Sequence, residues 1–338
     1  MMAYRGDVML SLGIIGCGRV TTMFHLNAIS KVEGIKVVAV ADPDSDRMND
    51  VKKKSGAERG YLDYRDLLSD VDIEAVAVNT PPSLHEEMII DSLRACKHVL
   101  CEKPIARSLE EYNRIKQVMK DTGLYVIPVH NYSLTPNLLK AKEIIKSGEL
   151  GNVRQVALRF DNNLWSYRSK TEFRVEEIYG VVEDLVPHVL SVVLVLSDQK
   201  LELIDVKAWK RRYPVYDNLS FTLGDTDGVM FDCTMNWTSL IPGFGLEIVG
   251  DRGVITMDLM KFPYRVNIKS ETRSTVIDKK GLGKYLEVVK FEHPAFRKQY
   301  EHFMDIVEGR IDPTFTIEDE IQMLRIMDEV TLKLTEHD

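Results

Sequence analysis

Two hydrophobic patterns alternate along the first 130 residues of the chain. Short, continuous apolar runs rich in β-branched residues are typical of strands that are covered on both faces of a parallel sheet. These expected strands are residues 11–16, 35–42, 73–80, 98–104 and 124–130. The polar, helix-like segments between them are residues 20–30, 45–54, 63–69, 83–95 and 108–122. Repeated strand–helix alternation predicts a doubly wound α/β domain with a parallel sheet over residues 1–130.

Two of the expected helices begin with the Ser-x-x-Glu pattern of a capping box, Ser83 to Glu86 and Ser108 to Glu111. In a capping box the serine and glutamate side chains accept hydrogen bonds from backbone N–H groups that the first helical turn leaves unpaired. We therefore expect Ser83 and Ser108 to be the N-caps of their helices.

The pattern changes after residue 150, where strands follow one another with short turns between them. The expected strands are residues 153–160, 218–224, 229–237, 245–250 and 253–259. Asp227-Gly228 and Asp251-Arg252-Gly253 are hairpin signals, so these strands are expected to pair as an antiparallel sheet. Helices are expected near residues 184–197, 294–309 and 317–335. The second domain is therefore of the α+β class and is expected to occupy residues 131–338.

The bulk composition narrows the class of protein. The 338 residues exceed the usual size of one domain, which agrees with two. Hydrophobic and charged contents of 44% and 28% are ordinary for a globular protein, and the net charge of −8 is spread along the chain. Without a basic block, neither nucleic acid nor an anionic membrane is an expected partner.

The cysteines and the N-terminal segment bear on where the protein works. Cys17, Cys96, Cys101 and Cys233 form no CxxC pair and have no histidine cluster beside them. We therefore expect no metal site and a reducing, cytoplasmic setting. The apolar run near Cys17 has the length of a signal peptide, but its flanks are poor for export, and we interpret it as the first strand. No apolar run approaches the ~20 residues of a membrane-spanning helix.

A glycine-containing turn follows the first expected strand and opens the first expected helix. Gly16 and Gly18 would let backbone N–H groups approach a pyrophosphate, although Thr21 stands where the third glycine of this fingerprint is expected. Asp42 ends the second strand and is suited to bind the ribose hydroxyls of a dinucleotide. Because an acid there would repel a 2′-phosphate, the pattern favours NAD over NADP.

Two alternatives stay open for this turn. Arg19 and Arg47 lie close enough in the sequence to keep NADP as a second cofactor. The glycines and Asp42 also fit a plain turn in which Asp42 caps the next helix.

The segment NTPPSLHEEMIIDSLRACKHVLCEKP, residues 79–104, resembles the glucose–fructose oxidoreductase/inositol dehydrogenase (Gfo/Idh/MocA) family, in which a Thr-Pro…His segment precedes a Glu-Lys-Pro. Residues 130–156 and the segment GVVEDLVPH at 180–188 resemble later parts of that family. The resemblance implies an N-terminal Rossmann domain and a C-terminal α+β domain with a large, mostly antiparallel, open-faced sheet. That sheet often forms the oligomer interface in the family, so a homodimer or homotetramer is implied as well.

The resemblance also implies roles for individual residues. The NAD site would be lined by Gly16, Gly18, Arg19, Asp42, Thr80, Pro81, His85, Glu102 and Lys103. The reacting carbon of the substrate would be surrounded by Lys103, Asp184 and His188. The implied activity is that of an NAD(P)-dependent dehydrogenase, which transfers a hydride between the nicotinamide and a secondary alcohol or ketone of a sugar, cyclitol or related polyol.

Elementary chemistry agrees with these roles. Oxidising a secondary alcohol requires a group that removes the hydroxyl proton, and histidine is the usual side chain for this at neutral pH. Asp184 and His188 are four residues apart and therefore share one face of a helix. Lys103 follows the fifth strand, where its ammonium would hold the hydroxyl and stabilise alkoxide charge. Pro104 restricts the backbone of Lys103 to an extended conformation.

Each of these residues also has a simpler interpretation. Lys103 fits an exposed lysine at a strand end, and His85 fits a solvated residue of a capped helix. Asp184 fits a helix N-cap, and His188 fits a packed, hydrogen-bonded core residue. The chain departs from the family at Val186-Pro187, where smaller residues are usual, and a proline within a helix affects the geometry of the following turn.

Residues 161–173 form a candidate substrate segment, because an aromatic face and several hydrogen-bonding groups suit a sugar or polyol. The groups offered are Asn162, Asn163, Trp165, Tyr167 and Arg168. Among them Trp165 and Arg168 are the main substrate-binding candidates, although a solvated loop fits any one residue nearly as well. Two other classes of function stay open: a redox-neutral NAD-dependent glycosidase and a non-catalytic, dinucleotide-binding sensor.

Overall fold

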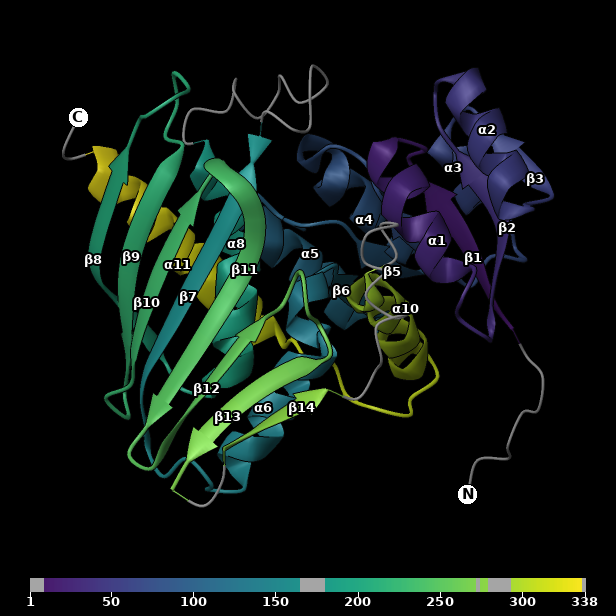
Figure 1. Ribbon diagram of the computed structural model, residues 1–338. Coiled ribbons are helices and arrows are strands. Elements are labelled where there is room, and N and C mark those ends of the chain that lie inside the picture. Colours follow the sequence, from purple (N-terminus) through teal and green to yellow (C-terminus); the bar gives the residue numbers. More distant parts are fainter. Residues whose placement is uncertain (1–8, 165–179, 272–273, 279–292, 336–338) are drawn as a thin grey trace. The chain divides into compact units, whose positions relative to one another are not determined.

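The structure is a computed structural model that describes residues 9–164, 180–271, 274–278 and 293–335 (Figure 1). The chain divides into two compact units, residues 1–129 with 291–317 and residues 130–290 with 318–338. The helix near residues 294–309, expected from the sequence in the second domain, belongs to the first unit. The reason is packing, because buried side chains of this helix belong to the hydrophobic core of the first unit.

The first unit contains a six-stranded parallel sheet in the order β3-β2-β1-β4-β5-β6. Its strands are β1 (Leu10–Ile15), β2 (Ile35–Ala41), β3 (Arg59–Tyr61), β4 (Ala75–Val78), β5 (His98–Cys101) and β6 (Val126–Pro128). This order, with β1 at the centre, is that of the Rossmann fold, so the predicted fold class is confirmed. The pattern had not indicated β3, whose three residues are all half-buried and form no apolar run.

Helices follow the strands of the first unit. They are η1 (Thr21–His25), α1 (Leu26–Ile29), α2 (Ser45–Ser55), α3 (Tyr64–Leu68), η2 (Pro82–Leu84), α4 (His85–Arg94), α5 (Leu109–Thr122) and α10 (Pro294–Val307). One hydrophobic core joins the sheet to α1, α2 and α10 and includes Ile29, Val51, Tyr300 and Phe303. Elsewhere in this unit α4 packs on β4, β5 and α5.

The two predicted capping boxes have different outcomes. Ser108 is the N-cap of α5, and its hydroxyl accepts a hydrogen bond from the N–H of Glu111 at 3.2 Å, as predicted. The prediction for Ser83 is wrong, because Ser83 lies inside the 3-10 turn η2 and α4 begins only at His85. Proline at the start of η2 favours this tight turn, which occupies the position expected for the cap.

The second unit contains an eight-stranded sheet in the order β14-β13-β12-β11-β7-β10-β9-β8. Its strands are β7 (Val153–Asn163), β8 (Leu201–Trp209), β9 (Asn218–Asp225), β10 (Met230–Asn236), β11 (Thr238–Gly250), β12 (Gly253–Asp258), β13 (Arg265–Ser270) and β14 (Ser274–Asp278). β7 pairs with β10 in parallel, and the other neighbouring strands that the described residues form are antiparallel. The mostly antiparallel sheet and both predicted hairpins, β9–β10 and β11–β12, are therefore confirmed.

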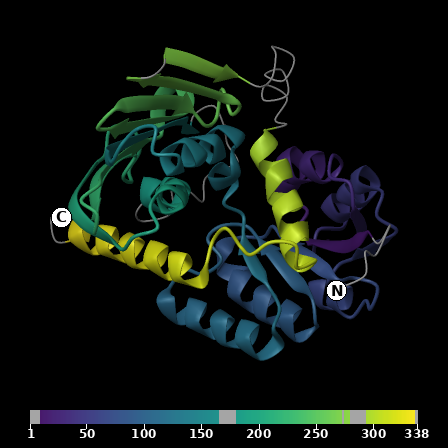
Figure 2. The same cartoon turned by 90° about the horizontal axis from the view of Figure 1, so that it is seen from below.

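The helices of the second unit lie on one face of this sheet (Figures 1 and 2). They are η3 (Asn131–Leu134), α6 (Pro136–Lys146), α8 (Val181–Leu196) and α11 (Ile317–Thr335). Helix α8 packs on β7, β9 and β10, and α11 reaches β8 through a hydrogen bond from Leu201 N to Gln322 at 2.8 Å. Helix α6 had not been predicted. Within the described part of this unit, no helix covers the opposite face of the sheet.

Candidate active site

Gly16 and Gly18 form the turn between β1 and the first helix, and each is a glycine for a different reason. Gly16 has a φ of +94°, and a Cβ atom there would lie 2.7 Å from the carbonyl oxygen of Asn79 at the end of β4. Gly16 therefore allows two strand ends to approach each other. Apart from Gly18 and its neighbours along the chain, no heavy atom lies within 4 Å of the place where a Cβ of Gly18 would be. The space beside Gly18 is thus open at the start of a helix, where a phosphate is bound well.

The carboxylate of Asp42 is fixed by the backbone on both sides. Its Oδ2 accepts a hydrogen bond from Cys17 N at 2.8 Å, and its Oδ1 accepts one from Asp44 N at 2.9 Å. The N-cap of α2 is Asp44, so the alternative in which Asp42 caps that helix is wrong. Asp42 instead connects the end of β2 to the glycine turn.

Thr21 stands where a third glycine was expected, and the helix has a π-helical form from this residue onward. Its hydroxyl donates to the carbonyl oxygen of Gly16 at 2.6 Å and accepts a hydrogen bond from Asn79 Nδ2 at 3.2 Å. The helix is π-helical over Thr21–His25, a local form often found at functional sites. The buried threonine thus connects the glycine turn to the end of β4.

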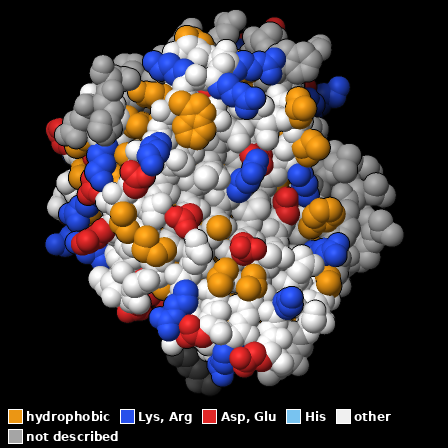
Figure 3. Space-filling model, turned by 60° about the vertical axis from the view of Figure 1, so that its left-hand side comes forward, with side chains coloured by type: hydrophobic (Ala, Val, Ile, Leu, Met, Phe, Trp, Pro, Cys, Tyr) orange, Lys and Arg blue, Asp and Glu red, His pale blue; other side chains and the backbone are white. Residues whose placement is uncertain are grey.

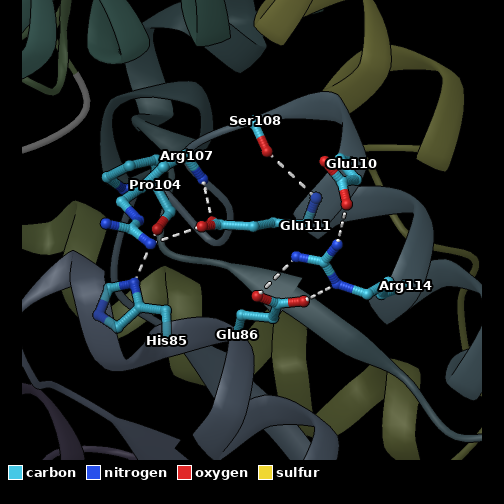
Figure 4. Close-up of polar contacts among 8 residues, drawn as sticks. All are labelled: His85, Glu86, Pro104, Arg107, Ser108, Glu110, Glu111 and Arg114. Atoms are coloured by element: carbon cyan, nitrogen blue, oxygen red, sulfur yellow. Dashed lines mark hydrogen bonds and ion pairs between the residues drawn. The ribbon is translucent and has the colours of Figure 1, made fainter.

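His85 connects two loops at the carboxyl ends of β4 and β5. Its ring has no exposed surface, and Nδ1 lies 2.7 Å from the carbonyl oxygen of Pro104 (Figure 4). Nε2 lies 2.8 Å from the carbonyl oxygen of Thr80. The alternative of a solvated histidine is therefore wrong. Thr80 and Pro81 lie directly before η2, and the histidine holds this segment beside the Glu-Lys-Pro turn.

Ion pairs continue this connection from α4 to α5. Glu86 pairs with Arg114, which also binds Glu110 at 2.6 Å (Figure 4). The Glu111 carboxylate accepts hydrogen bonds from the backbone N–H of Arg107 at 2.8 Å and from its guanidinium at 2.6 Å. The segment that follows Pro104 is thereby attached to the start of α5.

Glu102 and Lys103 follow β5 directly. Glu102 Oε1 lies 2.9 Å from His25 Nε2, and its Oε2 accepts a hydrogen bond from Lys103 N at 3.2 Å. Burial acts to raise the pKa of the Glu102 carboxyl, but the hydrogen bond and charge of His25, together with Lys103, outweigh burial and hold that pKa below its ordinary range. Glu102 is therefore a carboxylate at neutral pH. Lys103 is half-buried, and the peptide bond between Lys103 and Pro104 is cis.

In the second unit, α8 carries Asp184 and His188. The helix is buried on all sides except at Glu183, Asp184, His188 and its last residue, Leu196. Asp184 and His188 therefore share an accessible stripe on an otherwise apolar helix. The N-cap of α8 is Gly180, so Asp184 is not the cap, and the helix continues through Pro187.

Aromatic residues surround this stripe. The indole Nε1 of Trp237 donates a hydrogen bond to Asp184 Oδ2 at 3.2 Å. The ring of His188 packs edge-on against Tyr132 and Phe160, with centroid distances of 5.3 and 5.8 Å. Trp237 and Tyr132 are not among the residues predicted from the sequence, because a tryptophan between two strands carries no signal of a partner more than fifty residues away.

The structure thus brings the predicted residues together in two groups. The first unit gathers Gly16, Gly18, Asp42, Thr80, Pro81, His85, Glu102 and Lys103 at the carboxyl ends of its strands, together with Arg19 in the helix after the turn. The second unit places Asp184 and His188 on α8. Asn162 and Asn163 are half-buried at the end of β7, whereas Trp165, Tyr167 and Arg168 lie outside the described residues.

Two further observations concern the part of the chain that the structure describes. None of its helices is both long and apolar enough to cross a membrane. No three side chains of His, Cys, Asp or Glu are grouped there so as to hold a metal ion.

Comparison with protein families identifies the class to which these units belong. Residues 10–130 match the model of an oxidoreductase family with an NAD-binding Rossmann fold, and residues 138–256 match the C-terminal domain of the same family. The chain belongs to the Gfo/Idh/MocA oxidoreductase family. The resemblance inferred from the segment at residues 79–104 is thereby confirmed.

Individual relatives agree with this family. The chain is 30% identical to the myo-inositol 2-dehydrogenase of Thermotoga maritima over 142 residues, which are 42% of each chain. It is 28% identical to the inositol 2-dehydrogenase of Salmonella paratyphi B over 229 residues, which are 67% of this chain and 64% of the relative. Among the first relatives matched, the alignment thus spans about two fifths of their own length.

Solved structures show the same fold. The structure of myo-inositol 2-dehydrogenase from Lactobacillus plantarum superposes with a TM-score of 0.82 over 98% of each chain, at 20% sequence identity. A putative myo-inositol dehydrogenase from Sinorhizobium meliloti gives the same TM-score at 19% identity, again over 98% of each chain. At these identities the comparison supports the fold of both units.

Proposed function

We propose that the protein is an NAD(P)-dependent oxidoreductase that transfers a hydride between the nicotinamide and a secondary alcohol or ketone of a sugar, cyclitol or related polyol. The observation that carries the proposal is the position of Lys103, half-buried at the carboxyl end of β5, in the same unit as the turn formed by Gly16, Gly18 and Asp42. Ligands of doubly wound sheets bind at this edge. Membership of an oxidoreductase family supports the same reading.

The glycine turn fits a dinucleotide. The open space beside Gly18 would receive the pyrophosphate, and the fixed carboxylate of Asp42 would accept hydrogen bonds from ribose hydroxyls. Thr80 and Pro81 would line the same site, and Arg19 opens the helix at the turn. The buried ring of His85 would support the site by holding the loops of Thr80 and Pro104. Glu102 would support it through its hydrogen bond with the backbone of Lys103. When bound, the nicotinamide supplies or accepts the hydride.

NAD is the proposed cofactor, with NADP as the second choice. Asp42 and Asp44 both lie at the end of β2, and Arg47 is paired with Asp44 at 3.2 Å. Two carboxylates beside the ribose disfavour a 2′-phosphate, and the paired arginine is less able to attract one. The preference is tested by measuring the dissociation constants of NAD and NADP for the same preparation.

Lys103, Asp184 and His188 are proposed to handle the substrate. The ammonium of Lys103 would hold the reacting hydroxyl and stabilise negative charge on its oxygen. His188 would accept the hydroxyl proton, and Asp184, oriented by Trp237, would bind the substrate or support the charged imidazole. Trp165 and Arg168 complete the proposed substrate residues, because an aromatic face and a hydrogen-bonding cation suit a sugar or polyol.

A substrate screen tests the proposed function. Sugars, inositols and sugar acids are supplied with NAD or NADP, and the absorbance of the reduced cofactor is followed. Reduction with one substrate class is the expected result. Turnover of aryl glycosides without accumulation of NADH would favour a redox-neutral glycosidase, and tight NAD binding without any turnover would favour a sensor.

We also propose that the protein works in the cytoplasm as a homodimer or homotetramer, formed through the open face and edges of the second unit's sheet. All four cysteines are free, which suits a reducing compartment. The strongly exposed apolar side chains of this sheet are Ile204, Trp209, Leu240, Ile241 and Val276, and Figure 3 shows apolar side chains among charged ones on this side. Such side chains are typical of association surfaces. Light scattering should give a multiple of the chain mass, and a monomer at micromolar concentration would contradict the proposal.

A further inference from the structure

A hydrogen-bonded series of three polar side chains, two of them fully buried, extends from α10 to the Glu-Lys-Pro turn within the first unit. Tyr300 and His25 have no exposed surface, and the phenol oxygen of Tyr300 lies 2.7 Å from His25 Nδ1. On its other side, His25 Nε2 lies 2.9 Å from Glu102 Oε1. Tyr300 and His25 are 275 residues apart in sequence, so this contact exists only in the fold.

The direction of the hydrogen bonds follows from the chemistry of the groups. A carboxylate only accepts, so His25 Nε2 carries the proton and donates it to Glu102. Burial raises the pKa of the Tyr300 phenol well above its usual range, so the phenol keeps its proton beside Nδ1 of His25. Its contacts with Tyr300 and Glu102, one at each ring nitrogen, hold the ring of His25 in one orientation.

The hydrogen-bonded series ends at the backbone of Lys103. The second carboxylate oxygen of Glu102 accepts the hydrogen bond from Lys103 N at 3.2 Å. On the other side of Lys103, the carbonyl oxygen of Pro104 is 2.7 Å from His85 Nδ1. The backbone is therefore held on both sides of Lys103, on one side by His25 through Glu102 and on the other by His85.

Stability alone gives no reason for this arrangement. Burying a carboxylate and a phenol carries a desolvation penalty that apolar side chains of similar volume would avoid. Phe296, in the same helix as Tyr300, already packs edge-on against the ring of His25. This penalty motivates a functional interpretation of the polar series.

We propose that His25 and Tyr300 are positioning residues that fix Glu102 and, through it, the backbone of Lys103. They touch neither cofactor nor substrate in this account. The catalytic part of the inference rests on the proposed function, in which Lys103 binds the reacting hydroxyl. The positional part, that the location of Lys103 depends on His25 and Tyr300, does not.

Tyr300→Phe and two variants of His25 test the proposal in the full chain. Tyr300→Phe removes only the hydroxyl, and its matched control is Tyr64→Phe, which removes the phenol that donates to Asp91 at 2.7 Å in the same unit. His25→Gln keeps an N–H donor for Glu102, whereas His25→Leu keeps none. With the best substrate of the screen, we expect kcat to fall about fivefold in Tyr300→Phe and about a hundredfold in His25→Leu, with partial rescue in His25→Gln. Because Glu102 also supports the NAD site, the KM for NAD should rise in the His25 variants, but by a smaller factor than the fall in kcat.

A second measurement needs no turnover. In protein labelled with 13C at the lysine Cε, the signal of Lys103 is assigned by its loss in Lys103→Arg. The signal should shift in Tyr300→Phe and in the His25 variants and stay in place in Tyr64→Phe. An unmoved Lys103 signal in Tyr300→Phe, or an equal loss of kcat in Tyr64→Phe, would overturn the proposal. If Lys103→Ala retains full turnover, the proposed function fails, while the shift of the signal still decides the positional inference.

Discussion

The indole Nε1 of Trp237 donates a hydrogen bond to Oδ2 of Asp184 across the core of the second unit. Trp237 is 1% exposed, whereas Asp184 lies in the accessible stripe of α8. A rigid, buried donor therefore helps to set the direction of this carboxylate. This relationship connects the packing of the sheet to the proposed proton-handling pair.

Trp237→Phe should lower kcat/KM about tenfold, because a hydrogen bond to a charged acceptor is lost while most of the aromatic volume is kept. Trp209→Phe is the matched control, since Trp209 is 48% exposed at the end of β8. Steady-state kinetics of the two variants provide the measurement. Equal kinetics in both would show that the Trp237–Asp184 contact has no part in activity.

The two glycines of the turn should respond differently to alanine. Gly16→Ala should lower the free energy of unfolding by about 2 kcal/mol or more, because its φ of +94° and the approach to Asn79 leave no room for a Cβ. Gly18→Ala should leave stability within about 0.5 kcal/mol but weaken NAD binding about tenfold or more, because the Cβ would occupy the open space. Urea unfolding and NAD titration of both variants separate the two effects. Unchanged NAD affinity in Gly18→Ala would contradict the assigned site.

Two histidines should make the first unit sensitive to mild acid. Burial lowers the pKa of His98 and His302 below the ordinary value of 6.5, and each accepts a backbone N–H, from Tyr125 and Thr314 respectively, at 3.2 Å. Because the unfolded chain binds these protons more readily, their contribution to stability is complete above pH 6.5 and is lost as the pH falls toward the lowered pKa values.

The free energy of unfolding, followed by urea titration between pH 8 and 5, should therefore decline below pH 6.5. The slope should reach at most about 1.4 kcal/mol per pH unit for each histidine. His98→Gln keeps an acceptor for Tyr125 N but does not titrate, so its slope should be smaller. A slope equal to that of the wild type would exclude His98 as a source of the acid sensitivity.

The cysteines should differ sharply in reactivity. Cys96 is exposed, whereas Cys17, Cys101 and Cys233 are buried. Burial, together with the charge of Asp42, raises the pKa of Cys17 to about 12, so its thiolate is scarce at pH 8. A thiol reagent should label one cysteine quickly in the native protein, and Cys96→Ser should remove that phase. A second fast phase in the native protein would contradict the described burial.

The strands and helices that could be predicted are those whose hydrophobic pattern lies within one continuous segment of the sequence. The apolar runs of β1, β2, β4, β5 and β6 are visible because a strand covered on both faces needs a continuous hydrophobic segment. By contrast, β8 alternates exposed and buried residues weakly and carries a register shift near Leu203, so no regular period identifies it. Ser83 failed as a cap because the proline before it starts a different turn.

The candidate site divides in the same way. Gly16, Gly18 and Asp42 could be assigned from the sequence because their order along one strand–turn–helix–strand unit determines their roles. Trp237 and Tyr300 could not, because each becomes relevant only when the fold brings it to a partner distant in sequence. The same holds for α10, whose place in the first unit depends on the packing of its buried face rather than on its own pattern.

Replacing Lys103 by alanine tests the central claim most directly. Lys103→Ala should bind NAD within about threefold of the wild type, because Glu102, Asp42 and the glycine turn remain, while kcat/KM on the best substrate falls at least about a thousandfold. Lys36→Ala, at an exposed lysine of β2 paired with Glu58, is the control and should behave as the wild type. If Lys103→Ala turns over that substrate at the wild-type rate, Lys103 is not the group that stabilises the reacting oxygen, and the proposed dehydrogenase mechanism is wrong.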